Sequence, residues 1–190
     1  METGQIPEGT VTVLFTDLVE STRLNQQLGD EQARALSRSI EEMAKQLVEA
    51  HKGVTIKEMG DGLMAVFQSA RRAITASREI QAEMRRRHRD GLDDRVAMRI
   101  GLHTGEVIAE DGDVHGETVI IAKRVEGLAP PGGVLASETV HGVLGTAREE
   151  LIDQGLSTLK GIDSEWRLYL VPPLRLGSLR RVRLAPRYGR

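Results

Sequence analysis

The sequence lacks the residues on which several classes of functional site depend. It contains no cysteine, which excludes disulfides, thiolate catalysis and zinc or iron–sulfur sites built on cysteine. No apolar run approaches the roughly 18 residues that a membrane span requires, and Met1–Thr10 has neither the basic nor the apolar segment of a signal peptide. We therefore expect a cytoplasmic protein without a membrane span.

Aromatic residues are scarce, and basic charge is concentrated at one end. One Trp, two Tyr and two Phe are too few for the stacking platforms of single-strand-binding proteins. Residues 175–190 hold six Arg and no acid, so the other residues carry a net charge of −8. An acidic body argues against a nucleic-acid partner. Because residues 175–190 show no helical or strand periodicity, we expect them to form a disordered basic tail.

The remaining residues, 1–174, have the composition of a single globular domain. The 190-residue chain is 39% hydrophobic and 28% charged, which is ordinary for a soluble fold with its own core. Its apolar periodicity predicts helices and strands in alternation. The predicted strands are 10–16, 54–59, 63–67, 95–103, 106–109, 134–136, one near 151, and 166–171. The predicted helices are 30–51, 69–89, 117–129 and 137–144.

The order of these elements predicts the fold class. The first six run β-α-β-β-α-β up to residue 103, which is the ferredoxin-like pattern. The later elements add a C-terminal αβ extension. We therefore predict an α+β fold in which the first strand lies antiparallel beside the third.

Two acidic residues occupy positions that this fold would bring together. Asp17 ends the first predicted strand, and Asp61 lies in the hairpin turn that precedes the third. Two facing carboxylates repel each other unless a cation lies between them. Mg²⁺ is bound by one or two carboxylates together with substrate phosphate, and the turn after Asp17 offers backbone N–H groups for that phosphate. The pair is therefore a candidate metal site.

Simpler interpretations compete for each of these residues. Asp-Gly is a common turn, and an aspartate at a strand end is often a helix cap. Residues 60–65 (GDGLMA) match a dinucleotide-binding glycine pattern, but that pattern must open a helix, and a strand is predicted here. The five histidines are scattered, so we expect His103 to be packed or hydrogen-bonded rather than to bind a metal.

Four segments, in order, resemble the catalytic domain of the class III adenylyl and guanylyl cyclases. They are FTDLVEST (15–22), KEMGDG (57–62), RIGLHTG (99–105) and DVHGETV (113–119), the last followed by Arg124. The resemblance covers roughly residues 9–171. It implies an enzyme that forms 3′,5′-cyclic AMP and pyrophosphate from ATP, with two divalent metal ions, Mg²⁺ or Mn²⁺, as cofactors.

The resemblance also implies a role for individual residues. Asp17 and Asp61 would bind the two ions, with the carbonyl of Leu18 as a further ligand. The ions would activate the ribose 3′-hydroxyl and neutralise the leaving pyrophosphate. Arg124 would stabilise negative charge on the α-phosphoryl group, and Lys160 would contact the triphosphate.

The resemblance implies an adenine-selecting pair and a homodimer. Lys57 only donates and Asp113 only accepts hydrogen bonds, which matches N1 and the 6-amino group of adenine and opposes guanine. Lys57 is four residues from Asp61, about 13 Å along an extended strand, so it does not reach the base of an ATP bound at its own Asp61. One chain would supply Asp17 and Asp61, and its partner Lys57, Asp113 and Arg124.

One position departs from the family pattern and keeps alternatives open. Ile120 stands where the family usually has an asparagine that orients the ribose, and losing such a contact costs roughly ten- to a hundredfold in rate. The first alternative is therefore a non-catalytic relative that binds ATP or a partner. A guanylyl cyclase is disfavoured by the polarity of Lys57 and Asp113, and a ferredoxin-like RNA-binding module by the acidic body.

Overall fold

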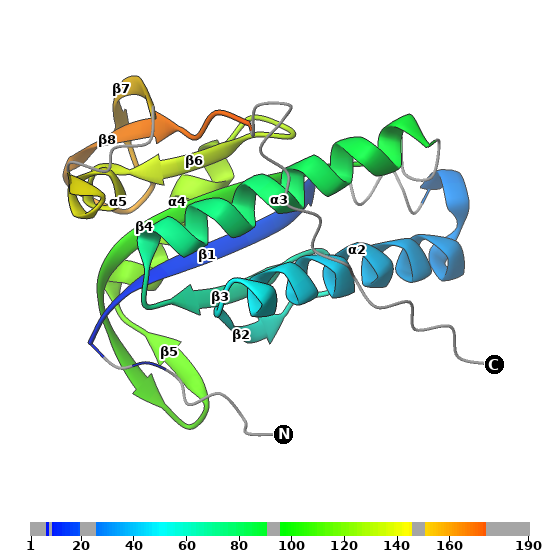
Figure 1. Cartoon of the computed structure of the whole chain (residues 1–190), viewed down its shortest axis with the longest axis horizontal. Helices are drawn as coiled ribbons and strands as arrows, with labels where there is room; N and C mark the ends of the chain where they lie inside the picture. The colour runs from blue at the N-terminus through cyan, green and yellow to red at the C-terminus, as the bar shows by residue number, and fades with distance from the viewer. Residues whose placement is uncertain (1–6, 8, 20–25, 91–95, 146–150, 174–190) are drawn as a thin grey trace.

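The computed structural model describes residues 7, 9–19, 26–90, 96–145 and 151–173. Over these residues the chain forms one mixed sheet with helices on both faces (Figure 1). Its strands are β1 (Gly9–Val19), β2 (Val54–Glu58), β3 (Leu63–Phe67), β4 (Ala97–Glu110), β5 (Asp113–His115), β6 (Val134–Ser137), β7 (Ile152–Thr158) and β8 (Glu165–Leu170). Its helices are α2 (Asp30–Ala50), α3 (Ala70–Arg89), α4 (Glu117–Leu128) and α5 (Glu138–Val143).

The sheet has the predicted ferredoxin-like core. The first four strands pair in the order β2-β3-β1-β4, and each of these pairings is antiparallel. Beyond β4 the sheet continues through β6, β8 and β7, with β6 parallel to β4. The predicted α+β class, with its C-terminal extension, is confirmed. The proposed tail, residues 175–190, lies outside the described residues.

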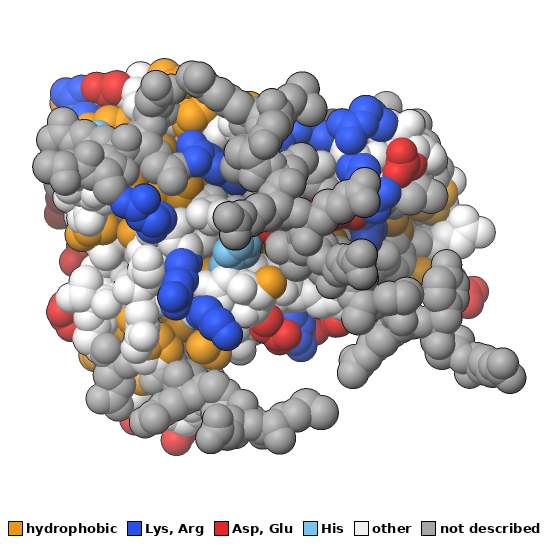
Figure 2. Space-filling model, viewed as in Figure 1, with side chains coloured by type: hydrophobic (Ala, Val, Ile, Leu, Met, Phe, Trp, Pro, Cys, Tyr) orange, Lys and Arg blue, Asp and Glu red, His pale blue; other side chains and the backbone are white. Residues whose placement is uncertain are grey.

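Helices α2 and α3 cover one face of the sheet because each carries an apolar stripe. Ile40 and Leu47 of α2 and Ile74 and Ile80 of α3 are buried in one cluster with Leu14 of β1. Charged and other polar side chains occupy the outer surface of these helices (Figure 2). Among the described residues, no helix is both long and apolar enough to cross a membrane.

Helix α4 covers the opposite face, which is the face that carries Asp17. Side chains alternate along a strand, so Val13, Phe15 and Asp17 of β1 point away from α2 and α3. Val13 and Phe15 are buried in a second cluster with Ala122 of α4. Because β1 is central in the four-stranded core and packed on both sides, its C-terminal end is held firmly in place.

Strand β4 differs from its prediction. The sequence predicts separate strands at 95–103 and 106–109, whereas β4 is continuous from Ala97 to Glu110. It pairs with β1 from Gly9↔Val107 to Val19↔Ala97, and this ladder overrides the low strand propensity of Gly105. Beyond it, Asp111 and Gly112 turn the chain into β5, a strand the sequence prediction lacks.

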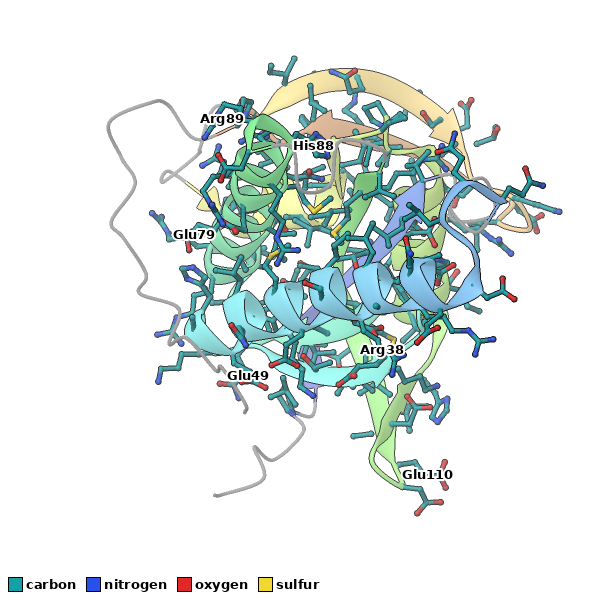
Figure 3. All side chains as sticks on the ribbon, turned by 90° about the vertical axis from the view of Figure 1, so that its right-hand side faces the viewer. Arg38, Glu49, Glu79, His88, Arg89 and Glu110 are labelled. Atoms are coloured by element: carbon teal, nitrogen blue, oxygen red, sulfur yellow. The ribbon has the colours of Figure 1, made fainter. Side chains whose placement is uncertain are left out.

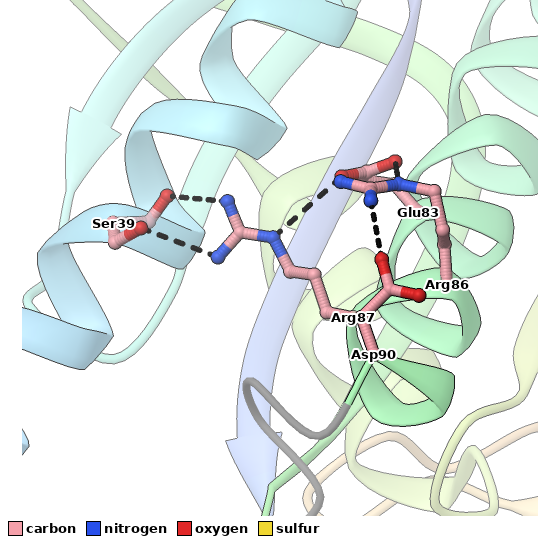
Figure 4. Close-up of polar contacts among 5 residues, drawn as sticks. All are labelled: Ser39, Glu83, Arg86, Arg87 and Asp90. Atoms are coloured by element: carbon pink, nitrogen blue, oxygen red, sulfur yellow. Dashed lines mark hydrogen bonds and ion pairs between the residues drawn. The ribbon is translucent and has the colours of Figure 1, made fainter. Parts of the chain in front are cut away.

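Polar contacts at the end of α3 link it to α2 (Figure 4). Arg87 donates to the Ser39 hydroxyl at 3.2 Å, and Arg86 forms ion pairs with Glu83 and Asp90, both at 2.6 Å. Exposed pairs of this kind contribute only about 0.3–0.5 kcal/mol each. The alignment of the two helices therefore depends mainly on their buried stripes.

His103 on β4 is buried and hydrogen-bonded, as predicted. Its Nδ1 lies 2.8 Å from the Ser137 hydroxyl and 3.2 Å from that of Thr139, and its ring meets Trp166 edge to face at 5.1 Å. Burial lowers the pKa of His103 to about 4 from 6.5. The folded protein therefore holds this imidazole neutral.

This burial predicts an acid-sensitive step in stability. The pKa of His103 is lower in the folded state, so the unfolded state takes up a proton first as the pH falls. The contribution of neutral His103 to stability is therefore complete above pH 6.5 and is lost as the pH falls to about 4. We expect the free energy of unfolding to fall over this window by up to about 1.4 kcal/mol per pH unit from this group. Urea denaturation of wild type and His103→Gln from pH 7.5 to 4 tests this. A variant with the same slope as wild type would contradict it.

Candidate active site

The end of β1 and the turn between β2 and β3 lie in direct contact. The Leu18 N–H donates to the carbonyl of Asp61 at 2.8 Å, and the Leu63 N–H donates to the Thr16 hydroxyl at 2.9 Å. Gly62 is required at this contact, because a Cβ there would lie 1.9 Å from the Thr16 carbonyl oxygen. The structure thus brings Asp17 and Asp61 together, as the expected strand order implies.

The electrostatics of this pair suit a divalent cation. Burial raises the pKa of Asp17, and the negative charge of Asp61 raises it further, while Lys123 and Arg99 oppose the rise. The described residues contain no group of three or more His, Cys, Asp or Glu side chains arranged for a metal. Mg²⁺ needs only one or two carboxylates when phosphate and water complete its shell. The two carboxylates, with the Leu18 carbonyl, therefore fit Mg²⁺ or Mn²⁺.

Glu41 of α2 fixes the turn that carries Asp61. Its Oε1 accepts hydrogen bonds from the backbone N–H groups of Met59 at 3.0 Å and Gly60 at 3.1 Å. The Glu41 side chain is buried, so these bonds are shielded from water and hold the turn to the helix. Glu41 carries no local signal of this role in the sequence, because it reads as one more acidic position of an amphipathic helix.

Lys57 and Asp113 form an ion pair between β2 and β5. Burial alone would raise the pKa of Asp113, but the hydrogen bonds from Lys57 and from the Val114 N–H, at 2.8 Å, outweigh it and lower that pKa. Both side chains stay partly exposed. The β4–β5 arm that carries Asp113 projects from the body of the protein, with Glu110 at its tip (Figure 3). A donor-only and an acceptor-only group thus lie side by side at the surface.

Arg124 and Ile120 lie one turn apart on the exposed side of α4. Ile120 is 51% exposed, and Arg124 is exposed with no polar partner among the described residues. Lys160 is exposed in the turn between β7 and β8. It follows Leu159, which is buried with Ile121 of α4. Both basic candidates therefore face solvent, Arg124 on α4 and Lys160 in a turn that packs against the same helix through Leu159.

The candidate residues lie outside two cavities that the described residues form. Two cavities of about 310 and 230 Å³ are lined by other residues of the described part. The larger lies between β1, β4 and the start of α3, and the smaller lies beside residues 130–134. The carboxylate pair is partly buried at the end of β1, and the Lys57–Asp113 pair lies at the surface between β2 and β5.

Comparison with known proteins places this chain in a family. The family described as adenylate and guanylate cyclase catalytic domain matches residues 5–172. A putative adenylate cyclase 3 of Rhizobium meliloti is 31% identical over 163 residues, covering 85% of this chain and 28% of the relative. The chain thus spans less than a third of that protein's length.

Solved structures show the same fold. An adenylate/guanylate cyclase/hydrolase from Silicibacter pomeroyi is 30% identical with a TM-score of 0.71, covering 86% of this chain and 96% of that one. The adenylyl cyclase CyaB from P. aeruginosa is 21% identical with a TM-score of 0.76, covering 88% and 95%. Guanylyl cyclase domains are also among the structures with this fold, so fold alone does not choose between ATP and GTP.

The Glu41 contacts give a testable role in positioning. Glu41→Ala removes the acceptor for two backbone N–H groups, and leaving them unpaired costs about 1–3 kcal/mol. Glu41→Gln keeps an acceptor oxygen in the same place. We expect the alanine variant to lose at least tenfold in Mn²⁺ affinity, measured by isothermal titration calorimetry, because Asp61 is no longer held against Asp17. Equal affinities for the two folded variants would contradict this role.

Proposed function

The chain belongs to the adenylate and guanylate cyclase catalytic domain family, and we propose that it is an adenylate cyclase that converts ATP to 3′,5′-cyclic AMP and pyrophosphate. The observation that carries the choice of ATP is the Lys57–Asp113 pair. The observation that carries catalysis is the contact that sets Asp17 beside Asp61. The reaction would take place at the interface of a homodimer.

The carboxylate pair would hold two divalent ions, Mg²⁺ or Mn²⁺, together with the triphosphate. When bound, such ions lower the pKa of the attacking hydroxyl and stabilise charge on the phosphates. Asp17 and Asp61 supply the anchoring oxygens, with the carbonyl of Leu18 as a further ligand. Arg124 and Lys160, both exposed, supply positive charge to the α-phosphoryl group and the triphosphate.

The base would be read by hydrogen-bond polarity. Adenine presents an acceptor at N1 and a donor at its 6-amino group. Lys57 donates to the first and Asp113 accepts from the second, and the ion pair already holds the two side chains next to each other. Guanine presents the opposite polarity at both positions. Its N1–H donor would face the donor Lys57, and its O6 acceptor would face the acceptor Asp113.

The placement of the two pairs within one chain supports a shared site. Lys57 is on β2, which ends at Glu58, and Asp61 follows in the turn to β3, while the Lys57 side chain is engaged by Asp113 of β5. The exposed Arg124 has no polar partner among the described residues of its own chain. Twofold pairing would bring Lys57, Asp113 and Arg124 of one chain to Asp17 and Asp61 of the other, which creates two equivalent sites.

Ile120 favours a second candidate function, a non-catalytic domain that binds ATP. Its exposed side chain lies one turn from Arg124 on α4, where the family's ribose-orienting asparagine would lie. Isoleucine makes no hydrogen bond to a sugar. We expect this substitution to slow turnover, roughly ten- to a hundredfold, rather than to prevent ATP from binding.

An assay of cyclic nucleotide formation tests the proposed activity. Purified protein is incubated with ATP or GTP, with Mn²⁺ and separately with Mg²⁺, beside an Asp17→Ala control. We expect metal-dependent cyclic AMP, in excess of cyclic GMP, to fall at least a hundredfold in the control. A folded protein that binds ATP and forms no product above the control would favour the non-catalytic function instead.

Complementation tests whether two chains share each site. Asp17→Ala and Arg124→Ala each damage both sites of their own homodimer. In a mixed dimer, one site combines both defects and the other is intact. We expect an equimolar mixture to regain about a quarter of wild-type activity, because half of the dimers each carry one working site. Activity that stays at the level of the separate variants would place Asp17 and Arg124 in one chain's site.

A further inference from the structure

Lys123 of α4 lies beside the carboxylate pair, where a bound cation would lie. Its Nζ is 3.9 Å from Asp17 Oδ1 and 2.7 Å from Glu126 Oε2, and it stands over the ring of Phe15, 5.5 Å from the centroid. The ammonium group thus has two carboxylates within reach. It bonds directly to Glu126 and is one short movement away from Asp17.

Glu126 is fixed much more firmly than Lys123. The Glu126 side chain is 2% exposed, against 42% for Lys123. Its backbone packs closely on β4, because a Cβ on Gly101 would lie 2.2 Å from the Glu126 nitrogen. Burial raises the pKa of Glu126, the bond to Lys123 opposes that rise, and the charge of Asp17 adds to it. A rigid buried acid therefore faces a movable amine.

The two basic groups near Asp17 differ in how freely they can move away from an arriving cation. Asp17, Asp61 and Glu126 are acidic, while Lys123 and Arg99 are the basic groups that act on Asp17. Arg99 is directly opposite Asp17 in the ladder between β1 and β4, so its backbone is fixed by the sheet. Lys123 is on a helix, with an exposed, flexible stem, so it is the basic group that can withdraw when another cation arrives.

We propose that Lys123, which is bonded to Glu126 and lies 3.9 Å from Asp17, competes with the divalent cation at the carboxylate pair, and that Glu126 keeps its ammonium group from closing on Asp17. The inference rests on the function proposed above and adds a residue that regulates metal binding at its site. Positive charge beside Asp17 weakens metal binding at this carboxylate pair, so the site fills only at higher metal concentration or when ATP brings further negative charge. Glu126 limits this loss of metal affinity by holding Lys123 away from Asp17.

Direct metal binding separates this role from a structural one. Free Mn²⁺ is measured by electron paramagnetic resonance, without nucleotide, in wild type, Lys123→Met and Lys123→Arg. We expect the methionine variant to bind Mn²⁺ roughly tenfold more tightly, because the unit positive charge 3.9 Å from Asp17 Oδ1 no longer opposes a cation at that carboxylate. The arginine variant keeps the charge and should stay within threefold of wild type. Lys52→Met, at the opposite end of the β2–β3 hairpin, is the matched control for net charge.

Glu126 provides a second test with the opposite sign. Glu126→Gln removes the charge that holds Lys123, so we expect its ammonium group to shift toward Asp17 and Mn²⁺ to bind at least threefold more weakly. In a Lys123→Met background the same change should have a clearly smaller effect, since no amine remains to shift. Equal effects in the two backgrounds would show that Glu126 acts without Lys123 and would overturn its proposed hold on that ammonium group.

The outcomes distinguish this inference from the proposed function. If Asp17→Ala abolishes Mn²⁺ binding and Lys123→Met does not tighten it, the competition is refuted and the cyclase proposal stands. If Asp17→Ala binds Mn²⁺ as wild type does, the metal site itself is wrong, and both fail. Circular dichroism and thermal melting confirm that each variant is folded, so weaker or unchanged binding by a folded Lys123→Met protein counts against the inference.

Discussion

The antiparallel contact between the end of β1 and the turn before β3 is the interaction on which the site depends. Gly62 allows the turn to reach the Thr16 carbonyl, and the Leu18–Asp61 backbone bond closes the contact. Two carboxylates are thereby set together in a partly buried place, where their repulsion favours a cation. Glu41 fixes the turn that carries Asp61. Lys123 and Glu126 set the charge beside Asp17.

The sequence alone predicts the core of this arrangement and misses its surroundings. Strand order brings Asp17 to Asp61, and that follows from hydrophobic periodicity and the Gly60–Gly62 turn. The resemblance implies that Lys57 and Asp113 both select the base, but their direct contact depends on the arm formed by β4 and β5 and appears only in the structure. The Asp111-Gly112 turn was a usable signal for that arm. Glu41 and Lys123 carry no local signal, since each is an ordinary polar position of a helix until the packing is known.

The proposed division of the site between two chains would account for features that look incomplete in one. Arg124 is exposed with no polar partner among the described residues of its own chain, and the Lys57–Asp113 pair faces solvent. Charged side chains are costly to bury without a partner. At an interface with a second copy, a nucleotide bound to that copy would supply partners for them. Ile120 lies in the same exposed region, so its effect on turnover would be set by how closely the partner approaches the ribose.

A crystal structure with Mn²⁺ and a non-hydrolysable ATP analogue tests the central claim most directly. The account predicts anomalous density for manganese between Asp17 and Asp61 of one chain, with the adenine between Lys57 and Asp113 of a second chain. Manganese bound elsewhere would contradict the assignment of the carboxylate pair. A nucleotide held entirely by one chain would contradict the shared site.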